Sequence, residues 1–107
     1  MQKLNGYVEA GGISEIKRFE KEGDTLEGKL VAKRSFVNMR NGKENMLYII
    51  QTNDGKKVGV FGQAQLNLKM QEVSVGCDVM ICYEGKKAHP KRKGLTMHYF
   101  RVFYKRG

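Results

Sequence analysis

Short runs of alternating residues, separated by turn pairs, constrain the fold of this chain more than any other feature. Leu26, Gly28 and Leu30 recur at every second position, which is typical of a strand with one buried face. Two turn pairs follow, Asn41-Gly42 and Asp54-Gly55, and each predicts a reversal of the chain. The sequence therefore predicts an antiparallel meander of three strands. They are expected over residues 25–34, 45–53 and 56–62.

The second half of the chain predicts a helix and two more strands. Residues 63–72 are rich in helix formers and contain no β-branched residue. Alternation then returns over residues 77–84 and 95–105. The expected fold is all-β with one short helix, in the order β-β-β-α-β-β, which is the order of the five-stranded Greek-key barrel called the OB-fold. An SH3-like barrel is the alternative, but it does not require a helix of this length at that point.

A chain of 107 residues is long enough for one domain with a real core. We expect this domain over residues 25–107. Residues 1–24 are expected to be an N-terminal extension that adds a short strand or covers the barrel.

Positive charge is concentrated away from the N-terminal extension. The net charge of +9 divides into −1 for residues 1–24, +4 for residues 25–72 and +6 for residues 73–107. Five cations and no acid lie within the ten residues 85–94, between two predicted strands. A basic loop on a rigid hairpin favours a polyanionic partner, above all a nucleic acid, over the simpler alternative of solvated lysines. The cations are Lys86, Lys87, Lys91, Arg92 and Lys93.

Further cations are expected to line the same surface from the first strand and the loop after it. Lys29 and Lys33 are expected to share the outer face of that strand. The other three, which flank or occupy the loop over residues 37–44, are Arg34, Arg40 and Lys43.

Aromatic side chains supply the second requirement of a protein that binds single strands, which is flat surfaces for base stacking. If Asp54-Gly55 forms a two-residue turn, Tyr48 lies opposite Phe61 on the outer face, with Lys57 beside them. A three-residue turn would shift this pairing by one residue. Aromatic pairs also stabilise sheets without any ligand. In the two-residue register the core residues are Leu47, Ile49, Val58 and Val60.

The last strand and the rim of the first loop offer further contacts. Phe100 and Val102 are expected to point inward, which leaves Tyr99 and Arg101 as outward contacts. Phe36 lies at the rim of the first loop, where it is expected either to pack or to stack.

Catalysis has little support in the sequence. The two histidines, His89 and His98, stand in no metal-ligand spacing, and phosphate-cradling and nucleophile motifs are missing. Cys77 and Cys82 are poorly placed for a bridge within one strand, which indicates a reducing compartment. No run approaches the length of a membrane span. We expect a cytoplasmic non-enzyme, in a host cytoplasm if it is phage-encoded, with no cofactor, no metal and no membrane partner.

Several segments, taken in order, resemble small OB-fold single-stranded DNA-binding proteins of phage and archaeal type. They are GDTLEGKLVAKR, LYIIQTNDGKKVGVFGQAQL, VSVGCDVMICYEG and YFRVFYK, which together span roughly four fifths of the chain. The resemblance implies a barrel that binds single strands through its second and third strands and through the loops at residues 37–44 and 85–94. The sequence ends on Lys105, Arg106 and Gly107, not on the acidic recruiting tail of the bacterial housekeeping protein.

Three functions remain open from the sequence. The first is sequence-tolerant binding of single-stranded DNA in replication, recombination or repair. The second is RNA binding of cold-shock or ribosomal type, since the same barrel serves either backbone. The third is a protein-interaction or virion module with a basic docking face. A homodimer is also left open by the exposed edges of such a barrel.

Overall fold

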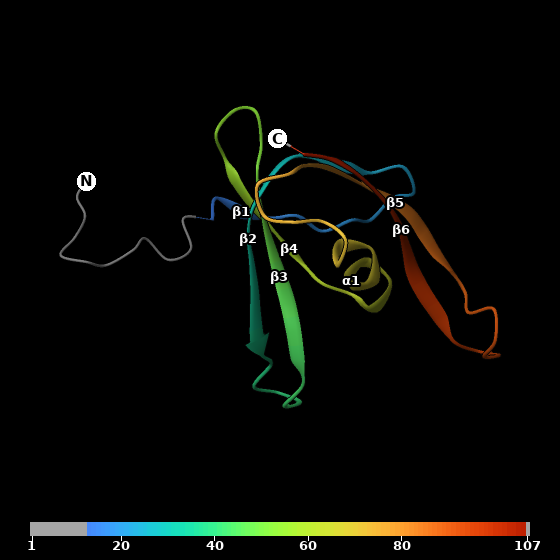
Figure 1. Ribbon diagram of the computed structural model, residues 1–107. Helices are drawn as coiled ribbons and strands as arrows, with labels where there is room; N and C mark the ends of the chain where they lie inside the picture. Colours follow the sequence, from blue (N-terminus) through green and yellow to red (C-terminus); the bar gives the residue numbers. More distant parts are fainter. Residues whose placement is uncertain (1–12, 107) are drawn as a thin grey trace.

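The computed structural model describes residues 13–106, which form one six-stranded sheet and one short helix (Figure 1). This described part is therefore mostly β with a single short helix after the β-meander, as the sequence predicts. Residues 1–12 of the expected N-terminal extension lie outside the described residues. In chain order the elements are β1 (Glu15–Ile16), β2 (Thr25–Val37), β3 (Glu44–Gln51), β4 (Lys57–Phe61), α1 (Ala64–Met70), β5 (Asp78–Ala88) and β6 (Thr96–Lys105).

The strands are arranged in the order β1-β4-β3-β2-β5-β6. All neighbours are antiparallel except β1 and β4, which are parallel. The expected barrel is not closed by strand pairing within the described residues, because β4 pairs with β1 and not with β6. A seam therefore separates β4 from β6.

Residues 13–24 lie across this seam. Ser14 N and Lys17 N donate to backbone carbonyls of β4, at 2.7 and 2.8 Å. Further along the segment, the Phe19 ring packs against Phe100 of β6, with centroids 5.5 Å apart. Gly59 permits the approach of β1, since a Cβ at this position would lie 2.9 Å from Ile16 Cδ1. The segment thus connects the two sides of the open sheet by packing and by a few backbone bonds.

One face of the sheet, here called the inner face, packs against α1. Helix-forming residues give α1 its conformation, and Leu66 and Met70, one turn apart, are fully buried. The Gln65 Oε1 atom accepts a hydrogen bond from Phe100 N at 2.8 Å, and Lys33 Nζ donates to Met70 O at 2.9 Å. A cation at the last carbonyls of a helix is electrostatically favourable. α1 is therefore bound to β2 on one side and to β6 on the other.

The pairing of β3 with β4 differs from the predicted register by one residue. The turn has three residues, Asn53 to Gly55, with Thr52 N donating to Lys56 O at 2.9 Å and Gly55 at φ 89°. Val60 consequently lies opposite Tyr48. The predicted two-residue turn is wrong, and so is the outer position of Tyr48, which is 2% exposed in the core.

A β-bulge at Val31 changes the faces of β2. Before the bulge Lys29 lies opposite Gln51, and after it Lys33 lies opposite Tyr48. The extra residue moves the side chains beyond it to the other face of the sheet. Lys29 is therefore on the outer face and Lys33 on the inner face, so the prediction that they share the outer face is wrong.

Candidate nucleic-acid interface

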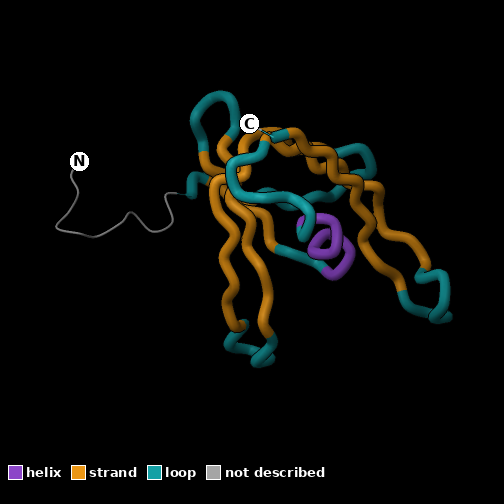
Figure 2. Tube along the Cα trace, in the orientation of Figure 1, coloured by secondary structure: helices purple, strands orange, loops and turns teal. Residues whose placement is uncertain are grey.

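Two long hairpins project from the sheet, and they carry most of the net charge. The first arm is residues 33–48 of β2 and β3, and the second arm is residues 84–99 of β5 and β6. In the view of Figure 1 both arms point toward the same end of the molecule, and Figure 2 shows α1 between their bases. Together they hold nine of the 20 Lys and Arg residues and only two of the 11 Asp and Glu residues. The arms are therefore the strongly basic part of the protein.

The tip of the second arm is ordered by a histidine. His89 Nδ1 accepts hydrogen bonds from Lys91 N and Arg92 N, at 3.0 and 3.2 Å, and His89 N donates to Leu95 O at 2.7 Å. These hydrogen bonds leave the side chains of Lys91, Arg92 and Lys93 exposed to solvent. Such an arrangement presents three cations without a flexible tail.

Two of the cations predicted for this loop belong to the strand itself. Lys86 lies opposite His98 and Lys87 opposite Met97, because β5 continues to Ala88. Adjacent strand residues point to opposite faces, so the two lysines supply one exposed cation to each face of the arm.

The tip of the first arm is a tight turn held by asparagine side chains. Asn38 Oδ1 accepts from Arg40 N at 2.8 Å, and Asn41 Oδ1 accepts from Lys43 N at 2.9 Å. Gly42, at φ 69°, completes the reversal. Both side chains of interest, Arg40 and Lys43, are exposed at this tip.

An aromatic pair lies on the outer face where the first arm joins β4. The rings of Phe36 and Phe61 meet edge to face, with centroids 5.6 Å apart, and Phe61 is 40% exposed. Arg34 belongs to the same face, since Leu47 is opposite both Arg34 and Phe61. The structure thus replaces the predicted pair of Tyr48 and Phe61 with Phe36 and Phe61. The sequence signal for this difference was the alternative three-residue turn, which shifts the pairing of β3 with β4 by one residue.

Tyr48 and Lys33 are withdrawn from the predicted surface. The Tyr48 hydroxyl donates to Asn67 Oδ1 at 2.5 Å, and burial raises the pKa of this phenol above its ordinary value. The Lys33 ammonium is bound at the end of α1. Both side chains therefore stabilise the contact between the sheet and α1.

Two lysines lie at the other end of the outer face. Lys29 and Lys57 are the two neighbours of Gln51, and both are exposed. The outer face of β2, β3 and β4 thus has lysines at one end and Arg34 with the aromatic pair at the other.

The predicted contacts of β6 form a separate surface. Phe100 is buried, as predicted, and the exposed Arg101 lies 5.1 Å from the Phe103 ring and 3.8 Å from Glu84 Oε2. Tyr99 is half-buried opposite Gly85. β2 pairs with β5 only from Thr25 to Lys29, so Phe36 lies beyond the part of β2 that neighbours β5, and these residues form a surface separate from Phe36 and Phe61.

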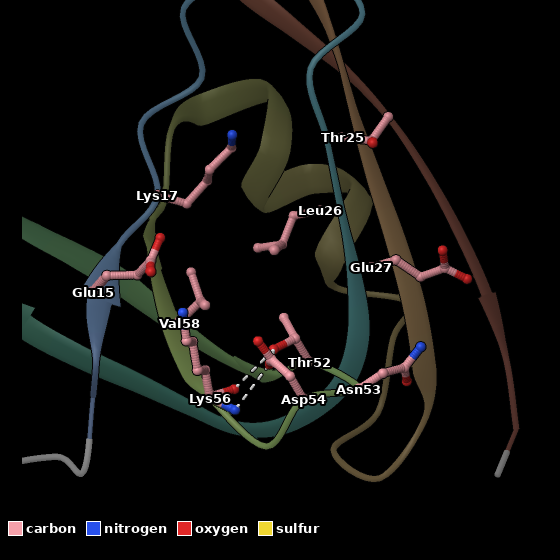
Figure 3. Close-up of a pocket in the computed structure, with 10 residues that line it drawn as sticks. All are labelled: Glu15, Lys17, Thr25, Leu26, Glu27, Thr52, Asn53, Asp54, Lys56 and Val58. Atoms are coloured by element: carbon pink, nitrogen blue, oxygen red, sulfur yellow. Dashed lines mark hydrogen bonds between the residues drawn. The ribbon is translucent and has the colours of Figure 1, made fainter.

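A wide hollow of about 510 Å³ lies at the end of β3 opposite the first arm tip. Figure 3 shows the side chains that line it. Three carboxylates and two ammonium groups line it. Their mixed charge gives a polyanion little attraction, so this hollow is not part of the proposed interface. The charged residues are Glu15, Glu27, Asp54, Lys17 and Lys56.

Within residues 13–106, no group of His, Cys, Asp and Glu residues has the geometry of a metal site. No helix of this described part is long and apolar enough to cross a membrane. Comparisons of the chain with protein-family models, with curated proteins and with solved structures give no match.

Proposed function

We propose that this protein is an OB-type, sequence-tolerant binder of single-stranded DNA that acts in replication, recombination or repair. The observation that carries the proposal is the combination of two basic arms with an aromatic pair, the half-buried Phe36 and the exposed Phe61, on the outer face beside the first arm. Cations follow a phosphate backbone, and rings accept bases of any sequence.

The strand order supports the OB interpretation. The meander β2-β3-β4 is followed by α1, and β5 then returns to pair with the far side of β2 before β6. In an OB-fold, oligonucleotides bind the face of the second and third strands and the loops after the first and fourth. Here those features correspond to β3 and β4 with Phe61, and to the two arm tips. An OB barrel closes by pairing the strands that correspond to β4 and β6. Here β1 and residues 17–24 lie between these two strands instead.

The proposed contacts divide by chemistry. Phe36 and Phe61 stack with bases, and Arg34 lies beside them, where a guanidinium can bind a phosphate or stack. The exposed cations of the arms bind phosphates: Arg40, Lys43, Lys86, Lys87, Lys91, Arg92 and Lys93. No step in this function needs a catalytic group, and we propose a non-enzyme.

Fluorescence anisotropy with a labelled oligonucleotide tests the proposal. We expect the single strand to bind more tightly than the duplex, with a log affinity that falls by about 0.7 per neutralised phosphate for each unit of log salt. Matched DNA and RNA strands in competition decide between the two backbones. No binding of single-stranded DNA at low salt would reject the proposal and favour a protein-docking role for the basic arms.

A further inference from the structure

A small pocket lies between the first arm and the end of α1. It has a volume of about 170 Å³, and its walls combine two methionines with four polar side chains. The exposed Gln71 lies on its rim, and the buried Tyr48 and Met70 form its deeper part. The residues are Lys33, Met46, Tyr48, Asn67, Met70 and Gln71.

The polar groups of this pocket are mainly hydrogen-bond donors. Lys33 Nζ uses one donor on Met70 O, which leaves two of the three that an ammonium carries. Asn67 Oδ1 already accepts from the Tyr48 hydroxyl, and the NH₂ group of this amide keeps both of its donors. Within the described residues, neither Asn67 Nδ2 nor the Gln71 side chain has a hydrogen-bond partner. A ligand that offers acceptors would satisfy these groups.

The position of the pocket suggests how a ligand reaches it. α1 is bound by Lys33 of the first arm and, through Gln65, by Phe100 at the base of the second. α1 therefore lies between the bases of the two arms, and a strand that enters between the arms would reach it there. The half-buried Met46 offers flexible apolar surface for a flat ring, and the fully buried Met70 lies beneath it.

We propose that this pocket receives one unstacked base of a bound single strand and prefers bases that carry a carbonyl oxygen, namely thymine, guanine and cytosine, to adenine. The inference rests on the proposed DNA-binding function and adds a site that discriminates between bases to a surface that otherwise does not. Adenine carries no exocyclic oxygen: its acceptors are ring nitrogens, and its amino group is a further donor that would meet the Lys33 and Asn67 donors, so it satisfies them less well.

Methyl NMR on the full chain tests occupancy directly. With ¹³C-methyl methionine, we expect saturation by oligo(dT) to move the Met46 and Met70 signals through the ring current of the inserted base. Met80 is the internal control, because it pairs with Phe103 on the outer face of β5 and β6. If the oligonucleotide binds by anisotropy while the Met46 and Met70 signals stay unchanged, the pocket proposal is overturned and the DNA-binding proposal stands.

Matched lysine variants test the preference. Lys33→Met should reduce the ratio of oligo(dT) to oligo(dA) affinity at least about fivefold, the lower end of the discrimination that a bidentate hydrogen-bonded pair provides. Lys29→Met removes the same charge from the outer face of the same strand and should leave the ratio unchanged. Gln71→Ala, at an exposed position, tests the pocket without touching the bond to α1. An unchanged ratio in both pocket variants overturns the preference, and failure of the wild type to bind either strand overturns the proposed function itself.

Discussion

The hydroxyl of Tyr48 donates a hydrogen bond to Asn67 Oδ1 at 2.5 Å and so connects β3 to α1. This contact explains why an aromatic residue in the middle of a β-strand is not available for base stacking. The ring lies in the core beside Val60 and Leu66, and its polar end is satisfied by α1.

Tyr48→Phe should lower the free energy of unfolding by about 1 kcal/mol, because it leaves Asn67 Oδ1 without its donor. The affinity for oligo(dA), the strand that the pocket disfavours, should not change, since the ring remains buried. Urea unfolding and anisotropy measure the two quantities. Tyr104→Phe, at a position 43% exposed, is the matched control and should change neither. A selective loss of DNA affinity in Tyr48→Phe would contradict the assignment.

Phe61→Ala and Phe36→Ala should each weaken binding of single-stranded DNA by about 1 to 3 kcal/mol, because each removes a surface on which a base stacks. The dependence of log affinity on log salt should stay nearly the same, since no cation is removed. Affinity measured at several salt concentrations gives both results. Phe103→Ala removes an equally exposed ring from the surface of β6 and should have a smaller effect. Equal losses of affinity in all three variants would mean that stacking is not localised to the Phe36 and Phe61 pair.

The strands and the helix follow from local patterns, and the site depended on features that these patterns do not determine. Asp54-Gly55 marks the turn correctly, but Gly55 accepts the positive φ of either turn length, and the choice decides whether Tyr48 faces α1 or solvent. The bulge at Val31 has a similar effect on Lys33. Neither feature leaves a clear pattern in the alternation. The pairing of β1 with β4 joins residues far apart in the sequence, and no local signal predicts it.

Neutralising the tip of the second arm should reduce the salt dependence of DNA binding. In a variant with Lys91→Gln, Arg92→Gln and Lys93→Gln, the slope of log affinity against log salt should become shallower by about 0.7 for each phosphate that the tip no longer neutralises. The control is Lys56→Gln, which removes a cation from the lining of the mixed-charge hollow at the other end of β3. Slopes that are identical in wild type and triple variant would exclude the tip from the phosphate-binding surface.

Acid should destabilise the protein partly through Asp54. Hydrogen bonds from the Thr52 hydroxyl and from Lys56 N lower the pKa of this carboxyl below its ordinary value of 3.8. Its stabilising effect is therefore present above that value and is lost as the pH falls through the lower pKa of the folded state. Urea unfolding across the acid range should show a weaker pH dependence in Asp54→Asn. The pKa of Asp24 is also lowered, so this residue still contributes to the pH dependence of stability in that variant. An unaltered pH profile would show that the turn does not contribute.

The order of the second arm tip should depend on an acceptor at position 89. His89 Nδ1 accepts from two backbone amides, those of Lys91 and Arg92. His89→Ala removes this acceptor, so both amides should exchange their hydrogens faster with solvent. His89→Asn supplies a side-chain oxygen that can cap the amide two residues ahead, and it should preserve the slower exchange of Lys91. Amide exchange by NMR distinguishes the two variants. Anisotropy should show weaker DNA binding only for His89→Ala, because in that variant the three cations of the tip must be ordered when DNA binds. Equal exchange rates in wild type and His89→Ala would show that the strands alone hold this tip.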